Sequence, residues 1–204
     1  MKHPHKSTSS SKRASLNQLR IIGGKWRGRK LNFANAEGLR PTGDRIRETL
    51  FNWLAPVITD AHCLDLFAGS GVLGIEALSR GASSATLVEK NHAAIALLQQ
   101  NCSQLNIDHA EIIQADAIHW LTQLKPTGSG SIRVYDVIFL DPPFATALLQ
   151  PCCDLLNQHG LLADNAYIYI ETSSQQPAPA TPPSWNSLRE KTSGQVTYRL
   201  YRCD

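Results

Sequence analysis

The sequence predicts an α/β protein with a Rossmann-like fold, in which helices cover a mostly parallel, twisted β-sheet. Three observations support this prediction. Short apolar segments typical of buried strands alternate with longer helical segments between residues 63 and 170. The first of these strands runs directly into a glycine-rich turn and a helix. Two strand-like segments around Gly194 end the chain, so we expect a C-terminal antiparallel hairpin beside the parallel strands.

Each expected element has a local signal. Asp44 and Glu48 form a near capping box for a helix whose apolar residues share one face. Glycine or proline separates several of the later segments. The expected helices cover 45–55, 72–80, 91–105, 117–124 and 147–158. The expected strands cover 63–67, 85–88, 111–114, 134–140, 167–170, 188–192 and 196–202, with a small N-terminal β-hairpin extension in front of them.

Charge is segregated along the chain. The 204 residues carry a net charge of +3, but twelve of the 20 Lys and Arg residues lie in 1–47, with only two of the 17 acidic residues. The first 47 residues therefore carry +10 and the remainder −7. We expect a disordered basic tail over 1–17, a basic β-hairpin over 18–43 and one α/β domain over 44–204. The basic quarter predicts a polyanionic partner, although a solubilising tail is the alternative for its first residues.

Composition also excludes several classes of protein. No apolar segment is long enough to span a membrane, and the N-terminus lacks the apolar core of a secretory signal. The five cysteines form no C-x-x-C pair, which favours reduced thiols in the cytoplasm. The seven histidines show no metal-ligand spacing. We therefore expect a cytoplasmic protein with no metal and no membrane partner.

The glycine turn predicts a cofactor site. Gly69, Gly71 and Gly74 follow the strand over 63–67 and fit the pattern G-x-G-x-x-G. Nicotinamide, flavin and S-adenosylmethionine folds all use such turns, because glycine lets the backbone approach a ligand closely. Glu89, at the end of the next strand, is placed to accept ribose hydroxyls, or else is a surface acid. Asp116 is placed to accept from an adenine amino group, to cap the following helix, or both.

A second motif follows the strand over 134–140. Asp141-Pro142-Pro143-Phe144 ends that strand abruptly, because proline cannot donate to a β-ladder. A carboxylate, a proline carbonyl and an aromatic ring then lie together at the carboxyl end of the strand, where ligands of open α/β sheets bind. Such a group suits a planar base held by its exocyclic amine. Alone, the motif favours a simple turn with Phe144 as core filler, and the cofactor site upstream reverses that preference.

The N-terminal segment predicts contact with nucleic acid. Lys25, Arg27, Arg29 and Lys30 surround Trp26 between turn-forming glycines, which indicates a ribbon with a basic face. Trp26 either stacks on a base or packs in the core. The residues that we expect to contact RNA are Arg20, Lys25, Arg27, Arg29, Lys30, Arg40, Thr42, Arg45 and Arg47.

In combination and in order, these motifs resemble the bacterial 16S ribosomal RNA guanine-N2 methyltransferase family. The resemblance covers about Arg20 to Arg202. Its landmarks are Arg20–Gly24, Arg40–Leu54, Asp65–Gly71, Asp141–Phe144 and Gly194–Tyr201. It implies an S-adenosylmethionine-dependent methyltransferase fold, S-adenosylmethionine as cofactor and one 16S rRNA guanine, of the guanine-966 type, as target. It also implies action on the 30S subunit or a late assembly intermediate, and we expect the protein to be a monomer.

The resemblance assigns roles to individual residues. The catalytic residues are Asp141, Pro142, Pro143 and Phe144. The cofactor-binding residues are Asp65, Phe67, Gly69, Ser70, Gly71, Glu89, Lys90, Asp116, Ala117 and Asp141. Three alternatives stay open on the residues alone. The first is a methyltransferase with another substrate, either an exocyclic amine of DNA adenine or 23S rRNA or a protein amide. The second is a nicotinamide oxidoreductase, and the third is a non-catalytic RNA-binding assembly factor.

Overall fold

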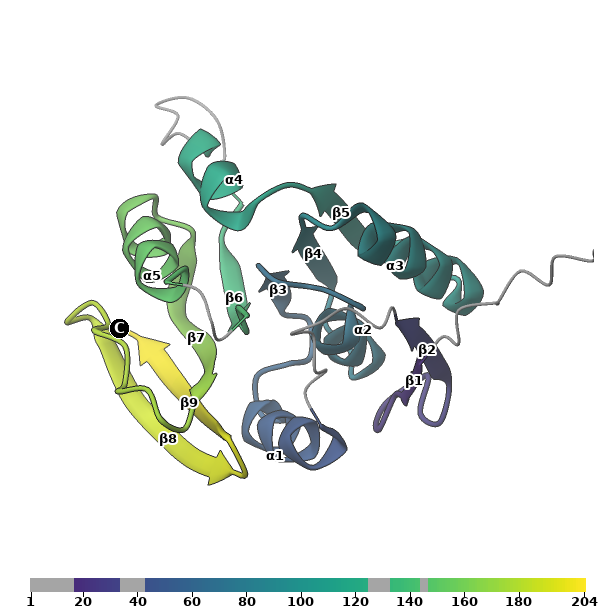
Figure 1. Cartoon of the computed structure of the whole chain (residues 1–204), viewed down its shortest axis with the longest axis horizontal. Coiled ribbons are helices and arrows are strands. Elements are labelled where there is room, and N and C mark those ends of the chain that lie inside the picture. The colour runs from purple at the N-terminus through teal and green to yellow at the C-terminus, as the bar shows by residue number, and fades with distance from the viewer. Residues whose placement is uncertain (1–16, 34–42, 125–132, 144–146) are drawn as a thin grey trace, which may run out of the picture.

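A seven-stranded sheet forms the centre of the molecule (Figure 1). A computed structural model describes residues 17–33, 43–124, 133–143 and 147–204. The strand order is β5-β4-β3-β6-β7-β9-β8, and the pairs from β5 to β7 are parallel, whereas β9 pairs antiparallel with both β7 and β8. This arrangement confirms the predicted fold class, including the C-terminal hairpin. A separate antiparallel pair, β1-β2, forms the N-terminal hairpin.

The helices and strands follow the expected order. The helices are α1 (Asp44–Leu54), α2 (Val72–Ser79), α3 (His92–Leu105), α4 (Ala117–Gln123) and α5 (Leu149–Gln158). The strands are β1 (Asn17–Arg20), β2 (Lys30–Phe33), β3 (His62–Asp65), β4 (Ser84–Glu89), β5 (Ala110–Gln114), β6 (Tyr135–Leu140), β7 (Leu162–Ser173), β8 (Trp185–Ser193) and β9 (Val196–Cys203).

The sheet separates two hydrophobic cores. Along β6, Val137 and Phe139 face the core shared with α1, α2 and α3, whereas Ile138 and Leu140 face the core shared with α4 and α5. Successive strand residues point to opposite faces, so a strand that is buried on both faces is apolar throughout. This double burial explains the continuous apolar segment in the sequence. It also places Asp141, the residue after β6, at the carboxyl edge of the sheet.

The last strands are longer than predicted. The expected strand over 167–170 extends over Leu162–Ser173, and β8 begins at Trp185 rather than at 188. The extension has a non-local cause, because β9 pairs with β7 from Tyr167 to Ser173. Because β9 pairs with it, β7 extends beyond its apolar centre as far as Ser173, which lines the pocket described below.

The N-terminal hairpin packs against the α/β body. Ile21, Trp26 and Leu31 are buried in the same core as α1 and α2. Trp26 is only 6% exposed, so the packing interpretation of this side chain holds. The turn between β1 and β2 lies so close to α2 that a Cβ on Gly24 would be 1.8 Å from the Ser79 carbonyl oxygen. Gly24 also has a φ of +73°, which favours glycine.

Buried polar side chains attach this hairpin. The Glu76 carboxylate, on α2, accepts from the backbone amides of Ile22 (2.9 Å) and Gly23 (2.8 Å). Asn101, on α3, bonds both the amide and the carbonyl of Asn32 and also donates to the Ser70 carbonyl. The hairpin is therefore fixed to α2, to α3 and to the loop after β3. The predicted division at residues 17/18 and 43/44 stays a prediction, and residues 1–16 and 34–42 lie outside the described part.

Two further observations concern the described residues alone. Among them, no helix is both long enough and apolar enough to cross a membrane. Within the same ranges, no group of three or more His, Cys, Asp or Glu side chains is arranged to hold a metal ion.

A candidate active site at the carboxyl edge of the sheet

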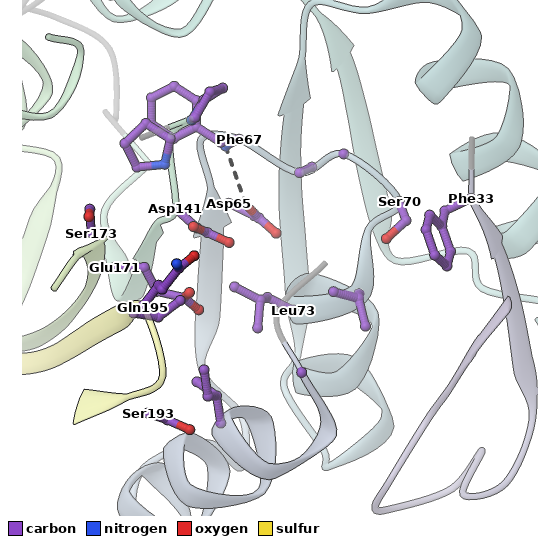
Figure 2. Close-up of a pocket in the computed structure, with 18 of the residues that line it drawn as sticks. Phe33, Asp65, Phe67, Ser70, Leu73, Asp141, Glu171, Ser173, Ser193 and Gln195 are labelled. Atoms are coloured by element: carbon purple, nitrogen blue, oxygen red, sulfur yellow. Dashed lines mark hydrogen bonds between the residues drawn. The ribbon is translucent and has the colours of Figure 1, made fainter. Parts of the chain in front are cut away.

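A pocket of about 600 Å³ opens at the carboxyl ends of the parallel strands (Figure 2). It lies where the strand order reverses, since β3 pairs with β4 on one side and with β6 on the other. Open α/β sheets bind ligands at such a reversal. The loop after β3 forms one side of the pocket, and the ends of β6 and β7 with the β8–β9 turn form the other.

The glycine turn has the conformation expected of a ligand-binding loop. Gly69 and Ser70 line the pocket, and Gly71 is the N-cap of α2, with a φ of +79°. A Cβ on Gly71 would be 2.2 Å from the Leu98 Cδ1 atom, so no side chain fits there. Glycine at position 71 therefore permits both the left-handed backbone and the close approach to Leu98 that this loop conformation requires.

Glu89 supports this loop from β4. One carboxylate oxygen accepts from the Gly69 amide at 2.8 Å, and the other accepts from the Asn91 amide at 2.7 Å. Glu89 is not among the residues that define the pocket wall, and the exposed Lys90 is not either. The predicted contacts of Glu89 and Lys90 with a cofactor stay predictions. What the structure shows is that Glu89 holds the glycine loop in place.

Asp65 brings a buried carboxylate to the pocket wall. Its side chain ends β3 and is 2% exposed, and it accepts from the Phe67 amide at 3.3 Å (Figure 2). Burial raises the pKa of Asp65 to about 7, the Phe67 and Gly74 amides oppose this rise, and the charge of Glu89 adds to it. A cation in the pocket would favour the ionised form, so this wall suits a positively charged ligand.

Asp116 and Ala117 lie at the start of α4. The Asp116 carboxylate accepts from the amides of Ile118 (3.1 Å) and His119 (3.2 Å), so the capping interpretation is confirmed. Neither Asp116 nor the buried Ala117 is among the residues that define the pocket wall. An additional contact between Asp116 and an adenine amino group stays a prediction.

The Asp-Pro-Pro segment lies in the pocket wall opposite the glycine loop. Asp141, Pro142 and Pro143 directly follow β6, and all three line the pocket. Asp141 points into it from the same side as Glu171 (Figure 2). Phe144, the fourth residue of the predicted motif, lies outside the described residues. The structure therefore brings three of the four predicted catalytic residues to one wall of the cavity.

Glu171 is a pocket residue that the sequence analysis missed. It lies near the carboxyl end of β7, is 3% exposed and accepts from the Tyr169 hydroxyl at 2.7 Å. Burial, and then the charge of Glu171, raise the pKa of Tyr169 well above its usual value, so the phenol stays a donor. A signal was present, because Glu171 follows an apolar strand just as Asp141 does.

The C-terminal hairpin contributes neutral polar groups. Ser193 ends β8, and Gly194 and Gln195 form the β8–β9 turn. All three line the pocket together with Ser173 (Figure 2). The Gln195 carbonyl accepts from the Ser174 amide at 2.9 Å, which ties this turn to the end of β7. The sequence analysis expected the hairpin but assigned these residues no place in the site.

Most of the predicted RNA-binding cations are exposed. Lys25, Arg27, Arg29 and Lys30 are exposed on the N-terminal hairpin, and the exposed Arg45 lines the pocket. Three hairpin cations have protein partners. The Arg29 guanidinium donates to the Gln104 carbonyl at 3.3 Å, that of Arg20 pairs with Asp44 at 3.3 Å, and the Lys25 ammonium lies 5.1 Å from the centre of the Trp26 ring. Arg40 and Thr42 lie outside the described residues. The contacts of all these residues with RNA stay predictions.

The structure contradicts the prediction for Arg47. Its side chain is fully buried and pairs with Asp44 at 2.6 Å and with Glu76 at 3.3 Å. It also donates to the Arg20 carbonyl at 3.0 Å. An RNA phosphate has no access to a guanidinium in this position. Arg47 instead joins α1 to α2 and to the N-terminal hairpin, because the charge of a buried arginine needs acidic and carbonyl partners.

Comparison with known proteins identifies the family. The family described as "Conserved hypothetical protein 95" matches residues 19–202. The chain belongs to this family. The matched range agrees with the extent of the resemblance seen in the sequence, about 20–202, so the predicted kinship is confirmed.

Two relatives and one solved structure show how similar this chain is to known proteins. "Ribosomal RNA small subunit methyltransferase D" of Escherichia coli K12 is 48% identical over 202 residues, which cover 99% of this chain and 95% of the relative. The protein of the same name from Haemophilus influenzae is 47% identical over 187 residues, 91% of this chain and 94% of the relative. The solved structure of a putative methyltransferase from Escherichia coli has a TM-score of 0.84 and 46% identity, covering 92% of this chain and 99% of that one.

Proposed function

We propose that this protein transfers a methyl group from S-adenosylmethionine to the exocyclic N2 amine of one guanine in 16S rRNA of the small ribosomal subunit. One observation carries the proposal. A single pocket joins the glycine loop after β3 to the Asp-Pro-Pro segment after β6, in a chain 48% identical to a ribosomal RNA small subunit methyltransferase. The identity supports the ribosomal substrate, and the chemistry of the pocket supports an amine as the methyl acceptor.

The pocket residues fit S-adenosylmethionine. The cofactor is a cation at its sulfonium and ammonium groups, and Asp65 offers a buried carboxylate at the pocket wall. Gly69 and Ser70 expose backbone beside it, while Phe67 and Leu97 offer apolar surface for an adenine ring. Glu89 and Asp116 complete the set of acceptors that we assign to the ribose and to the adenine amine. When bound, the cofactor supplies an electrophilic methyl group, so the main task of the protein is positioning.

Asp141 and the Pro142 carbonyl orient the nucleophile. The lone pair of a guanine N2 amine is delocalised into the ring, which makes the amine a weak nucleophile. Two acceptors, one for each N–H, hold the amine so that its lone pair points toward the cofactor side of the pocket. The carboxylate of Asp141 also stabilises the positive charge that develops on the nitrogen, because a fixed charge needs no reorganisation during the reaction. Asp141 is then placed to take the released proton.

The rest of the proposal concerns access of the RNA. A guanine enters the pocket only after leaving its stack, and Phe144 is assigned to stack on it once it is there. The exposed cations Lys25, Arg27, Arg29 and Lys30 contact rRNA phosphates, with Arg45 at the mouth of the pocket. We further propose that a monomer acts in the cytoplasm on the 30S subunit or on a late assembly intermediate.

Methyl transfer to 30S particles that lack the modification tests this function. The particles are incubated with the protein and tritiated S-adenosylmethionine, and the labelled nucleotide is mapped. We expect label at one guanine of 16S rRNA. Label on adenine, or on 23S rRNA when 50S particles are added, would favour another nucleic-acid methyltransferase. Calorimetric binding of NADH without binding of S-adenosylmethionine would instead support an oxidoreductase.

Replacement of Asp141 tests the mechanism. Asp141→Ala should reduce the single-turnover rate by about 10²-fold or more, because removal of one preorganised electrostatic group commonly has an effect of this size. Asp141→Asn retains an acceptor oxygen and should fall between Ala and the native protein. Calorimetry should show nearly native cofactor affinity for both. Asp154→Ala, at an exposed position of α5, is the matched control. A native rate for Asp141→Ala would contradict the assigned role.

A further inference from the structure

Glu171 lies beside Asp141, and the proposed methyl transfer does not use it. The registers of β6 and β7 place Leu140 opposite Ile170, so Asp141 and Glu171 are the next residues on two adjacent strands. Adjacent strands lie about 4.8 Å apart. Figure 2 shows both side chains on the same side of the pocket, opposite Ser70 and Phe33. Two carboxylates therefore face the region that we assign to the target base.

The surroundings of Glu171 fix its carboxylate at the pocket wall. β7 lies between β6 and β9: Ile170 pairs with Leu140 of β6, and Glu171 itself pairs with Tyr198 of β9. The Tyr169 hydroxyl donates to one carboxylate oxygen at 2.7 Å. This bond fixes the orientation of the carboxylate, and Glu171 lines the pocket. Burial of a carboxylate is costly in free energy, and its position at a cavity wall is typical of a functional group.

Gln195 adds an amide to the same wall. It lies in the β8–β9 turn, and its backbone carbonyl accepts from the Ser174 amide, so the end of β7 holds the turn in place. Its side chain lines the pocket near Glu171 (Figure 2). A glutamine amide supplies two N–H donors and one acceptor. Across the pocket wall the order is thus carboxylate, carboxylate, amide, from β6 through β7 to the β8–β9 turn.

This order matches the hydrogen-bonding edge of guanine. The Watson–Crick edge of guanine presents the N2 amine and the N1–H group as donors, followed by O6 as an acceptor. The corresponding edge of adenine presents an acceptor at N1, which a carboxylate would repel. We propose that Glu171 and Gln195 select guanine: Glu171 accepts from N1–H and the Gln195 amide donates to O6, while Asp141 holds N2. This assignment rests on the proposed methyl transfer and adds to it the residues that recognise the base.

A base analogue tests the proposal directly. 2,6-Diaminopurine keeps the 2-amine of guanine but has an acceptor at N1 and an amine at C6. We use 30S particles reconstituted with 16S rRNA that carries either guanine or 2,6-diaminopurine at the mapped position. The native protein should methylate guanine at least tenfold faster in single-turnover assays. Each correct contact to a base edge contributes about 1–3 kcal/mol of discrimination, which corresponds to a preference of about 5- to 150-fold.

The variant Glu171→Gln should reduce this preference for guanine by about tenfold, because an amide donates to the N1 acceptor of the analogue. Gln195→Ala, at an exposed turn position, should reduce it by about fivefold. The exposed Asp154→Asn is the matched control and should keep the native preference. Calorimetry with S-adenosylmethionine identifies folded variants. Should Glu171→Gln not fold, the result for Gln195→Ala decides.

The outcomes separate this proposal from the proposed function. A native protein that methylates no 30S guanine would overturn the proposed function itself. A native protein that methylates guanine, with the same preference over 2,6-diaminopurine in both variants, would overturn the recognition role alone. Equal loss of rate on both bases would also overturn it, because that result indicates a purely structural role. Only a change in the ratio of the two rates supports recognition by Glu171 and Gln195.

Discussion

The N-terminal and C-terminal hairpins reach the same pocket in different ways. β1–β2 is a separate sheet that contributes Phe33 to the pocket wall and carries exposed cations beyond it. β8–β9 continues the main sheet and contributes Ser193, Gly194 and Gln195. In protein–nucleic acid complexes, phosphate contacts position the protein, while contacts to bases specify the sequence. Under the function proposed above, the N-terminal hairpin would contact phosphates and the C-terminal hairpin would contact the base, on opposite sides of one cavity.

The attachments of the two hairpins differ as well. The N-terminal hairpin is held by buried side chains of α2 and α3, among them Glu76, Ser79 and Asn101. The C-terminal hairpin is held by backbone pairing of β9 with β7 over seven residue pairs. A hairpin attached by a few side chains is sensitive to their replacement, whereas a ladder distributes the same task over many backbone groups. Two measurements test these differences between the hairpins and a third tests the pocket between them, beginning with the largest expected effect.

Removal of the Glu76 carboxylate should strongly destabilise the protein. Glu76→Ala leaves Arg47 without one of its buried partners and two hairpin amides without their acceptor. We expect a loss of about 3–5 kcal/mol in the free energy of unfolding, as for other broken buried pairs. Urea unfolding measures it. The control in the other hairpin is Glu190→Ala, whose half-exposed carboxylate pairs with Arg199 and should contribute about 1 kcal/mol. Equal losses would remove the contrast.

Neutralising the N-terminal cations should weaken RNA binding and its salt dependence. Lys25, Arg27, Arg29 and Lys30 are replaced together by Gln, and affinity for 30S particles is measured over a salt series. The log–log slope should fall by about 0.7 for each phosphate that the variant no longer binds, with cofactor affinity unchanged. The matched control neutralises Arg189 and Lys191, which are exposed on β8. An unchanged slope in the fourfold variant, or an equal change in the β8 control, would argue against the division of tasks.

Asp65, which ends β3 and belongs to neither hairpin, should make the affinity for the cofactor depend on pH. Its pKa is raised from 3.8 to about 7, so the carboxylate ionises as pH rises through 7. A cationic cofactor prefers the ionised form, and the fraction ionised rises about tenfold between pH 6 and 8. Calorimetry should show a similar gain in affinity, absent in Asp65→Asn. Without ligand the sign is opposite: the folded protein binds more protons than the unfolded chain, so Asp65 makes stability fall between about pH 4 and 7.

Features with local causes were predictable from the sequence. β6 is apolar because both of its faces are buried, and two prolines mark its end, so Asp141 was assigned to the carboxyl edge of the sheet correctly. The glycine turn before α2 and the N-cap at Asp116 likewise have local sequence signals, a glycine pattern and a capping residue. In each case the signal lies within a few positions of the feature, although contacts from Glu89 and Leu98 also fix the glycine turn.

Features with distant causes were not predictable in the same way. Arg47 looked like an RNA contact because it lies in a basic segment, but its buried partner Glu76 is 29 residues away. Glu171 followed a recognisable strand, yet its place in the pocket depends on β7 lying beside β6, which strand order alone decides. The turn at Gln195 reaches the pocket because β9 pairs with β7 beyond the apolar centre of that strand. The places of Arg47, Glu171 and Gln195 therefore depend on contacts between distant residues, which local sequence patterns do not reveal.

The close contact between Gly24 and Ser79 has a consequence for how this protein tolerates mutation. Gly28, in the same turn, also has a positive φ of +82°, but nothing lies within 4 Å of its missing Cβ. Position 28 therefore tolerates residues that accept a left-handed backbone, such as Asn, at a modest conformational cost. At position 24 even one added methyl group collides with the backbone of α2. Two glycines four residues apart therefore differ in how freely they can be replaced, because a side chain collides with α2 at position 24 and meets open space at position 28.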